Sequence, residues 1–414
     1  MNKNLLTSLP SYYVLIKEMD GARVPLFREA NAHIHTPYSF SAFDRLETAF
    51  KMADDEEISV LGINDFLVTD GYESFHYGCI RHNIFPLFNI EFICLLREAQ
   101  NSGTRINDPN NPGRIYISGK GLDYPFSAGW YYKCYLKRIK RMSQKQIRSM
   151  TEKLNELVSQ TNPSLTLTYD DIKDKFAEEL VRERHLAKAV RHLAMDNFTT
   201  AEDQQKFIES LYGGRKSKAG MANIAALENE IRSNLLKAGG LAYVEEHKSS
   251  FPNLDKILKL IIKAGGIPCY PVLLDDSSGN FTEFENDPEK LYLSLTNMGI
   301  GCIELIPGRN DLSVLNDFVE FFNKKEFVIT FGTEHNTPEM TPLTVTSRGS
   351  VPLPDSLKQI AWEGVCVIAA HQYLRAQKRQ GYILADGTHS SDQRKELVKL
   401  GQVVIEYYLN RNQE

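Results

Sequence analysis

The sequence predicts an α/β fold built on a parallel sheet or barrel, and three observations support this prediction. Apolar strand-like segments alternate with helix-period segments over residues 28–95, and the alternation returns over residues 254–332. Polar and titratable residues gather where the predicted strands end, which is where parallel α/β folds carry their chemistry. The 414 residues are enough for one large α/β domain or for two to three ordinary ones.

The first alternating block contains three predicted strands, and a polar turn over residues 36–39 follows the first of them. The run over residues 99–114 has the composition of turns and loops throughout, and one more strand is predicted over residues 114–118. The elements of the block are a strand over residues 28–35, a helix over 43–57, a strand over 59–65, a helix over 72–82 and a strand over 84–94.

Helical segments dominate residues 130–240, which we interpret as a helical insertion of about 110 residues. Within it, residues 133–148 carry seven basic side chains. This run is either a phosphate-binding patch or a solvated helix face, and the lack of regularly spaced aromatic residues favours the second. The predicted helices of the insertion cover residues 144–160, 168–195, 201–212 and 222–238.

The second alternating block follows the insertion and ends in the tetrapeptide Thr-Glu-His-Asn over residues 333–336. The tail over residues 354–412 is predicted to be helical. The elements of the block are a helix over residues 254–264, a strand over 267–274, a helix over 288–298, a strand over 301–306, a helix over 311–324 and a strand over 327–332.

Composition excludes several classes of protein. Lys and Arg number 48 against 53 Asp and Glu, so the net charge of −5 provides no basic footprint and argues against a nucleic-acid partner. No stretch approaches the roughly 18 apolar residues that a membrane span needs, and the first residues lack the pattern of a signal peptide. The six cysteines show no C-x-x-C spacing and are expected to be reduced, so we expect a cytoplasmic protein without membrane contact.

His33 and His35 are the strongest local feature. Residues two apart on a strand point to the same face, so both imidazoles project together at the end of the first predicted strand. Such a pair can begin a metal site, or it can simply line a polar pocket.

Other strand ends add titratable groups. Asp65 ends the second predicted strand, and Glu334 and His335 follow the last one. Glu91 lies inside an apolar strand, where a carboxylate needs a cation or hydrogen-bond donors. Pairing with an arginine would satisfy Glu91 equally well.

The order of these motifs resembles the PHP (polymerase and histidinol phosphatase) superfamily. A sixth segment, over residues 184–189 (RHLAKA), resembles bacterial PHP phosphoesterases with a helical insertion. The five motif segments are residues 32–39 (AHIHTPYS), 61–66 (LGINDF), 88–92 (FNIEF), 264–271 (AGGIPCYP) and 331–336 (FGTEHN). The resemblance implies a distorted (β/α)7 TIM-like barrel with divalent metals at the carboxyl ends of its strands.

The resemblance also shows departures at the ligand positions. Side chains that cannot ligate a metal, or ligate it poorly, stand at five of these positions, namely Phe40, Phe66, Tyr116, Tyr270 and Asn336. The family pattern leaves His33, His35, Glu91 and Glu334 around one metal, with His335 one place from the expected ligand. The resemblance therefore implies one divalent metal (Zn, Mn or Fe) or none, and a degenerate site.

The resulting domain organisation is an N-terminal extension (1–27), a barrel in two parts (28–125 and 241–345), a helical insertion (126–240) and a helical tail (346–414). The sequence predicts neither the oligomeric state nor whether the tail covers the barrel or mediates association.

Two functions follow from the resemblance. The first is a metal-dependent hydrolase of phosphoesterase type, acting on a small, anionic or phosphorylated molecule by metal-activated water. In this function, Asp65 acts as a base or orients the water; alternatively, it caps a helix or supports a ligand. Arg309 holds an anionic group of the substrate; alternatively, it is a surface arginine without such a role. The second is a catalytically silent PHP-fold protein that binds a ligand or partner. A weaker third option, a nucleic-acid-processing accessory, is opposed by the charge balance.

Overall fold

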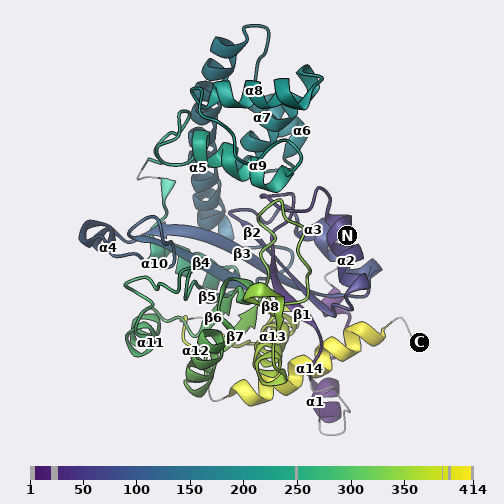
Figure 1. Cartoon of the computed structure of the whole chain (residues 1–414). Helices are drawn as coiled ribbons and strands as arrows, with labels where there is room; N and C mark the ends of the chain where they lie inside the picture. Colours follow the sequence, from purple (N-terminus) through teal and green to yellow (C-terminus); the bar gives the residue numbers. More distant parts are fainter. Residues whose placement is uncertain (1–4, 20–26, 248–249, 385, 390–392, 412–414) are drawn as a thin grey trace.

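The protein is described from a computed structural model (Figure 1), which defines residues 5–19, 27–247, 250–384, 386–389 and 393–411. Part of the predicted N-terminal extension lies outside the described residues, since these omit residues 1–4 and 20–26. The described part of the extension contains the short helix η1 (Leu5–Thr7) and the helix α1 (Tyr12–Met19).

Seven strands form one sheet in which every strand pairs with its sequence neighbours, in the order β1 to β7. The first and last strands meet through a bridge between Ile34 and Glu334, which brings the two edges of the sheet together. The predicted distorted barrel is thereby confirmed. The strands are β1 (Ala30–Ile34), β2 (Val60–Phe66), β3 (Phe85–Leu95), β4 (Arg114–Lys120), β5 (Ile267–Val272), β6 (Cys302–Leu305) and β7 (Val328–Phe331).

Strand β4 runs antiparallel to both of its neighbours, which an all-parallel expectation does not include. Glu91 pairs with Ser118 on one side, and Ser118 pairs with Cys269 on the other. The segment between β3 and β4 contains only the short helix α4 (Arg97–Ser102), which stands where the sequence predicts loop. The chain therefore returns directly beside β3, because a parallel strand would need a longer crossover.

Helices pack against the outside of the barrel as in other α/β folds. In α10, for example, the apolar side is buried at Ile257, Leu260 and Ile261. The outer helices are α2 (Leu46–Asp55), α3 (Tyr72–Arg81), α10 (Leu254–Lys263), α11 (Pro288–Asn297) and α12 (Leu312–Lys324).

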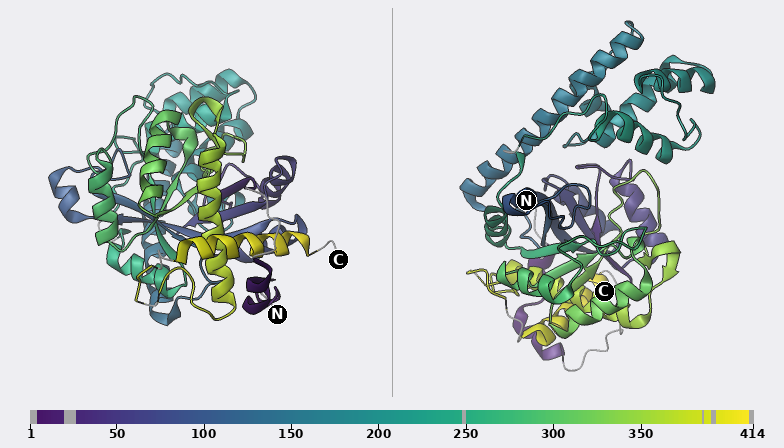
Figure 2. Two further views of the ribbon diagram at one scale, coloured as in Figure 1. Left: turned by 90° about the horizontal axis from the view of Figure 1, so that it is seen from below. Right: turned by 60° about the vertical axis from the view of Figure 1, so that its left-hand side comes forward.

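The insertion is helical as expected (Figure 2). It has a hydrophobic core of its own. Its first helix is longer than predicted and begins at Gly129. The predicted helix over residues 168–195 is wrong as one element, because the chain is not helical over residues 177–182. The helices are α5 (Gly129–Thr161), α6 (Tyr169–Phe176), α7 (Glu183–Asn197), α8 (Ala201–Leu211) and α9 (Ile224–Ile231), which continues as a π-helical turn, η2 (Arg232–Leu236).

Backbone and side-chain bonds explain the break between α6 and α7. The amide of Gln144 on α5 bonds both the N–H and the carbonyl of Val181, at 3.1 Å each, which holds that residue outside any helix. The N–H of Leu180 donates to the carbonyl of Tyr38 in the turn after β1, at 3.0 Å. The start of α7 is therefore fixed beside the turn that follows His35.

The tail covers the end of the barrel that lies away from the helical insertion (Figure 1). Helix α13 (Asp355–Ala376) is buried almost throughout and packs on residues that begin the strands, such as Val60, Phe85 and Val328. Helix α14 (Arg394–Asn410) packs on α13 (Figure 1). A small hairpin precedes them, formed by β8 (Thr346–Ser347) and β9 (Val351–Pro352). Among the described helices, none has the length and apolarity to cross a membrane.

Candidate metal centre

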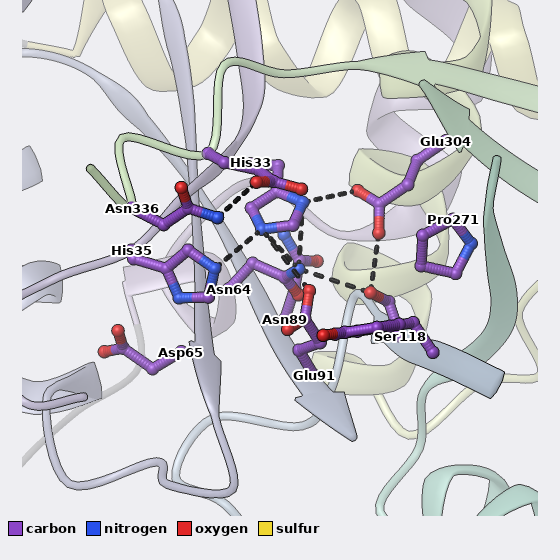
Figure 3. A network of polar contacts seen from close by, with 12 residues as sticks. His33, His35, Asn64, Asp65, Asn89, Glu91, Ser118, Pro271, Glu304 and Asn336 are labelled. Carbon is purple, nitrogen blue, oxygen red and sulfur yellow. Dashed lines mark hydrogen bonds and ion pairs between the residues drawn. The ribbon is translucent and has the colours of Figure 1, made fainter. Parts of the chain in front are cut away.

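Three buried side chains converge inside the barrel at the end that faces the insertion. His33 on β1, His35 just after it and Glu91 on β3 each offer a ligand atom, and these atoms lie within 4.8 Å of one another. The Nε2 atoms of the two histidines are 3.4 Å apart, and Glu91 Oε2 is 3.8 Å from His33 Nε2 (Figure 3). The order of the strands explains why these three side chains lie close together. Strands β1, β2 and β3 are neighbours in the sheet, and the three side chains face the interior of the barrel.

Burial sets the protonation of the cluster. It lowers the pKa of His35 well below its usual range, and the adjacent His33 lowers it further. Burial also raises the pKa of Glu91 well above its usual range, and the carboxylates of Glu334 and Glu304 add to the effect. A cluster with a neutral imidazole and a carboxylate that lacks compensating charge is suited to a cation.

His33 is oriented by Glu304 on β6. Its Nδ1 lies 2.9 Å from Glu304 Oε2, and this carboxylate also accepts hydrogen bonds from Ser118 Oγ (2.6 Å) and Lys120 Nζ (2.5 Å). Burial alone would raise the pKa of Glu304, but Lys120 and His33 hold it well below its usual range. Because an ionised carboxylate only accepts, His33 donates from Nδ1 to Glu304, and its Nε2 faces the cluster.

A second, indirect chain supports His35. Its Nδ1 lies 3.4 Å from Ser39 Oγ, which donates to Asp65 Oδ1 at 2.5 Å. Asp65 also accepts from the N–H and the hydroxyl of Thr36, at 2.7 and 2.5 Å. Burial raises the pKa of Asp65 to about 7, although the bonds from Ser39 and Thr36 act in the opposite direction. The side chain of Asp65 thus organises the turn after His35 and does not line the cavity described below.

Glu334 and His335, both predicted as ligands, lie differently. The carboxylate of Glu334 is paired with Arg309 and also accepts from Asn336, so it borders the cluster with its charge already engaged. The ring nitrogens of His335 face Thr333 Oγ1 and the carbonyl of Thr341, at 2.7 Å each, outside the cluster. The structure therefore brings together three of the five predicted ligands and leaves these two apart.

The chain at this point has an unusual backbone. Glu334 and His335 both have left-handed φ, at 59° and 52°. The N–H of Glu334 donates to the carbonyl of His33 at 2.9 Å, and its own carbonyl accepts from the N–H of His35 at 2.7 Å. These bonds close the barrel beside the histidines, and the strained backbone is of the kind found at functional sites.

Aromatic side chains stand at positions where the sequence resemblance implies metal ligands. Phe40 stacks on the His35 ring with centroids 4.6 Å apart, and Arg182 lies 4.4 Å over the ring of Phe66. The hydroxyl of Tyr270 donates to Glu285 at 2.7 Å, away from the cluster. Tyr116 lines the cavity.

A cavity of about 330 Å³ lies over the cluster, between the barrel and the insertion. His33, Glu91 and Glu304 form part of its barrel side. Four arginines also line it: Arg182, Arg184 and Arg232 from the insertion and Arg309 from the loop after β6.

Several of these guanidinium groups are incompletely bonded. Arg182 Nε, Arg184 Nη1 and Arg232 Nε are buried and have no hydrogen-bond partner within the described part of the chain. Glu183 balances part of the charge, since Arg232 Nη2 donates to it at 3.1 Å. Burial, and then Arg232, lower the pKa of Arg184 to about 10. Unused buried donors beside a cavity fit an anionic ligand.

The residues around the cluster also test whether a metal would fit. Asn64 Nδ2 lies 3.0 Å from His33 Nε2, while Asn64 Oδ1 is buried and accepts no hydrogen bond from any described residue. The two imidazole nitrogens and the carboxylate that lie within 4.8 Å of one another form a donor set of the right chemistry for a divalent transition metal.

Two solved structures share this fold. One is a protein from Bifidobacterium adolescentis provisionally described as a metal-dependent phosphoesterase, with 13% identity, a TM-score of 0.51 and coverage of 82% of this chain and 96% of that one. The other is an amidohydrolase from Chromobacterium violaceum, solved with bound sulfate and no metal, with 16% identity, a TM-score of 0.51 and coverage of 80% and 96%. No protein-family model and no curated protein matches the chain. The likeness supports the barrel fold of this chain.

Sequence reasoning missed Glu304 and Lys120, which are central to the orientation of His33. Glu304 could have been found by the argument applied to Glu91, because it is also a carboxylate within an apolar strand. Lys120 carried no comparable signal, since a lysine at the end of a predicted strand is normally exposed. Its burial follows from the reversed direction of β4, which only the structure shows.

Proposed function

We propose that this protein is a metal-dependent hydrolase of phosphoesterase type that acts on a small phosphorylated molecule with a single divalent metal. The observation that carries the proposal is the pair of imidazole Nε2 atoms 3.4 Å apart, next to Glu91, beneath a cavity lined by four arginines. Guanidinium groups with unused buried N–H donors on the cavity wall favour an anionic substrate over a neutral one.

His33, His35 and Glu91 would hold the metal, with Glu334 as a fourth ligand once it is released from Arg309. Mixed imidazole and carboxylate donors suit Zn, Mn or Fe better than Mg or Ca. The metal, when bound, would supply a Lewis acid and lower the pKa of a coordinated water to about 7.

The arginines would bind and orient the substrate. Arg184 and Arg232 have buried donors available on the cavity wall, and the Arg309 side chain is 44% exposed and can turn from Glu334 to an incoming anion. Guanidinium groups pair with phosphoryl oxygens in a bidentate manner, which fixes the orientation of the group. In this proposal the insertion supplies substrate recognition and the barrel supplies the reacting groups.

Asp65 is better suited to supporting a ligand than to acting as a base. Its oxygens accept three hydrogen bonds from Thr36 and Ser39, and it is not on the cavity wall. We therefore assign it, within this proposal, to holding His35 through Ser39.

A catalytically silent, ligand-binding protein is the second candidate. The stacking of Phe40 on His35 and the burial of Phe66 favour it, because apolar rings occupy positions at which further metals would be bound in the family pattern. A single metal also lacks the clamp that two metals provide in phosphoryl transfer.

Turnover of an aryl phosphate with added Zn²⁺ or Mn²⁺ separates the two candidates. The hydrolase proposal expects turnover by the wild-type protein that is abolished in both His35→Ala and Glu91→Ala. Absence of turnover over a panel of phosphate esters with either metal, in protein that binds the metal, would instead support the silent protein.

A further inference from the structure

Lys120, the last residue of β4, is enclosed in the barrel. Its side chain is fully buried, and its ammonium lies 2.5 Å from Glu304 Oε2, whose side chain is 1% exposed. A buried ammonium is costly unless it is paired. Lys120 does not line the cavity and thus has no route to a substrate there.

Glu304 connects Lys120 to the candidate metal centre. The oxygen that accepts from Lys120 is the same one that faces His33 Nδ1 at 2.9 Å. The other oxygen accepts from Ser118 at 2.6 Å. Three donors from β1 and β4 thereby fix both oxygens of one carboxylate on β6, which leaves Glu304 little freedom to rotate. Figure 3 shows two of these contacts, those with His33 and Ser118.

We propose that Lys120 is a positioning residue of the metal centre, which acts through Glu304 to hold His33 with Nε2 directed at the cluster. This inference rests on the proposed function. Without the ammonium, Glu304 would lose one of the two donors to Oε2 and would keep a buried charge with weaker compensation. Partners of metal-bound histidines set the orientation of the ring, so a shift of Glu304 is passed to His33.

The role predicts a specific pattern of coupling. If Lys120 acts only through Glu304, then removing Lys120 has no further effect on metal binding once Glu304 has been neutralised. A lysine that merely filled space would instead change stability without this dependence on Glu304.

The experiment measures Zn²⁺ affinity by competition with a chromogenic chelator for wild type, Lys120→Met, Glu304→Gln and the double variant Lys120→Met/Glu304→Gln. We expect each single variant to bind Zn²⁺ about 10 to 100 times more weakly, as for other residues that support a metal ligand. The double variant should bind no more weakly than Glu304→Gln alone. It removes both charges together, so it remains informative if Lys120→Met fails to fold.

Lys137→Met, an exposed lysine on α5, serves as the matched control and should keep wild-type affinity. Wild-type affinity in Lys120→Met would overturn the inference, as would a double variant at least tenfold weaker than Glu304→Gln. Wild-type protein that binds no Zn²⁺ would contradict the proposed function itself, whereas binding that is unaffected by Lys120→Met would overturn only the role of Lys120.

Discussion

The Nε2 atoms of His33 and His35 lie 3.4 Å apart in a buried site. Two nitrogens bound to one Zn²⁺ at about 2.0–2.1 Å in tetrahedral geometry are separated by about 3.4 Å. The imidazoles therefore already have the spacing of a ligand pair. The Nδ1 atom of each ring faces an oxygen that helps to orient it. For His33 this is Glu304 Oε2, and for His35 it is Ser39 Oγ, which itself donates to Asp65.

This arrangement predicts which histidines hold the metal. His33→Ala and His35→Ala should each weaken Zn²⁺ binding by more than about 100-fold, because changes behind a ligand alone cost about 10 to 100-fold. His335→Ala is the matched control, since its ring faces Thr333 and Thr341 instead of the cluster. Metal content after dialysis checks this, and an equal loss in His335→Ala would contradict the assignment.

The arginines predict a binding site for anions. Arg184→Ala should weaken the binding of inorganic phosphate, measured by calorimetry, by about tenfold, which corresponds to one charge-assisted hydrogen bond. Arg148→Ala, on α5 and paired with Asp170 away from the cavity, should leave phosphate binding unchanged. Equal affinities in the two variants would remove the cavity arginines from the proposal.

Gly332 predicts a steric limit next to His33. A Cβ at Gly332 would lie 2.4 Å from the Cβ of His33, closer than real side chains approach. Gly332→Ala should therefore lower the free energy of unfolding by about 1–3 kcal/mol, as for other overpacked sites, and weaken Zn²⁺ binding by displacing His33. Gly308→Ala, whose Cβ would have its nearest contact at 3.7 Å, should change neither. Chemical denaturation and the chelator assay measure the two effects, and wild-type binding in Gly332→Ala would contradict the prediction.

Glu285 predicts how stability depends on pH. Burial raises its pKa from 4.5 to about 7, although bonds from Tyr270, Leu273 and Leu274 act in the opposite direction. Since the folded state holds the proton more tightly, this residue stabilises the protein below pH 4.5 and loses that contribution as the pH rises to 7. The rise in pKa from 4.5 to about 7 corresponds to a loss of about 3 kcal/mol in the free energy of unfolding, since one pKa unit is worth about 1.4 kcal/mol.

Glu285→Gln should therefore reduce the fall in the free energy of unfolding between pH 4.5 and pH 7.5, as measured by urea denaturation. Glu320→Gln, at an exposed position on α12, should leave the fall unchanged. A fall of the same size in Glu285→Gln and wild type would show that other groups cause it.

Much of the barrel could be predicted from local patterns. Alternation of apolar strands and helices located six parallel strands, because each segment carries its own periodicity and turn signals. The reversed direction of β4 could not be predicted in this way, since strand direction depends on which neighbours the chain reaches after residues 97–113. The break between α6 and α7 also depends on a distant partner, Gln144, that has no local signature.

The sequence by itself determined the presence of His33, His35 and Glu91 on interior faces of neighbouring strands, since side chains two apart share a face and a carboxylate in an apolar strand needs a partner. Only the tertiary structure decided how the other titratable groups divide. It pairs Glu334 with Arg309, turns His335 away and buries Lys120 against Glu304. The physical reason is that a buried charge is stable only beside an opposite charge, and the tertiary structure decides which one lies within reach. Arg309 and Glu334 are 25 residues apart in the chain, and Lys120 and Glu304 are 184 apart.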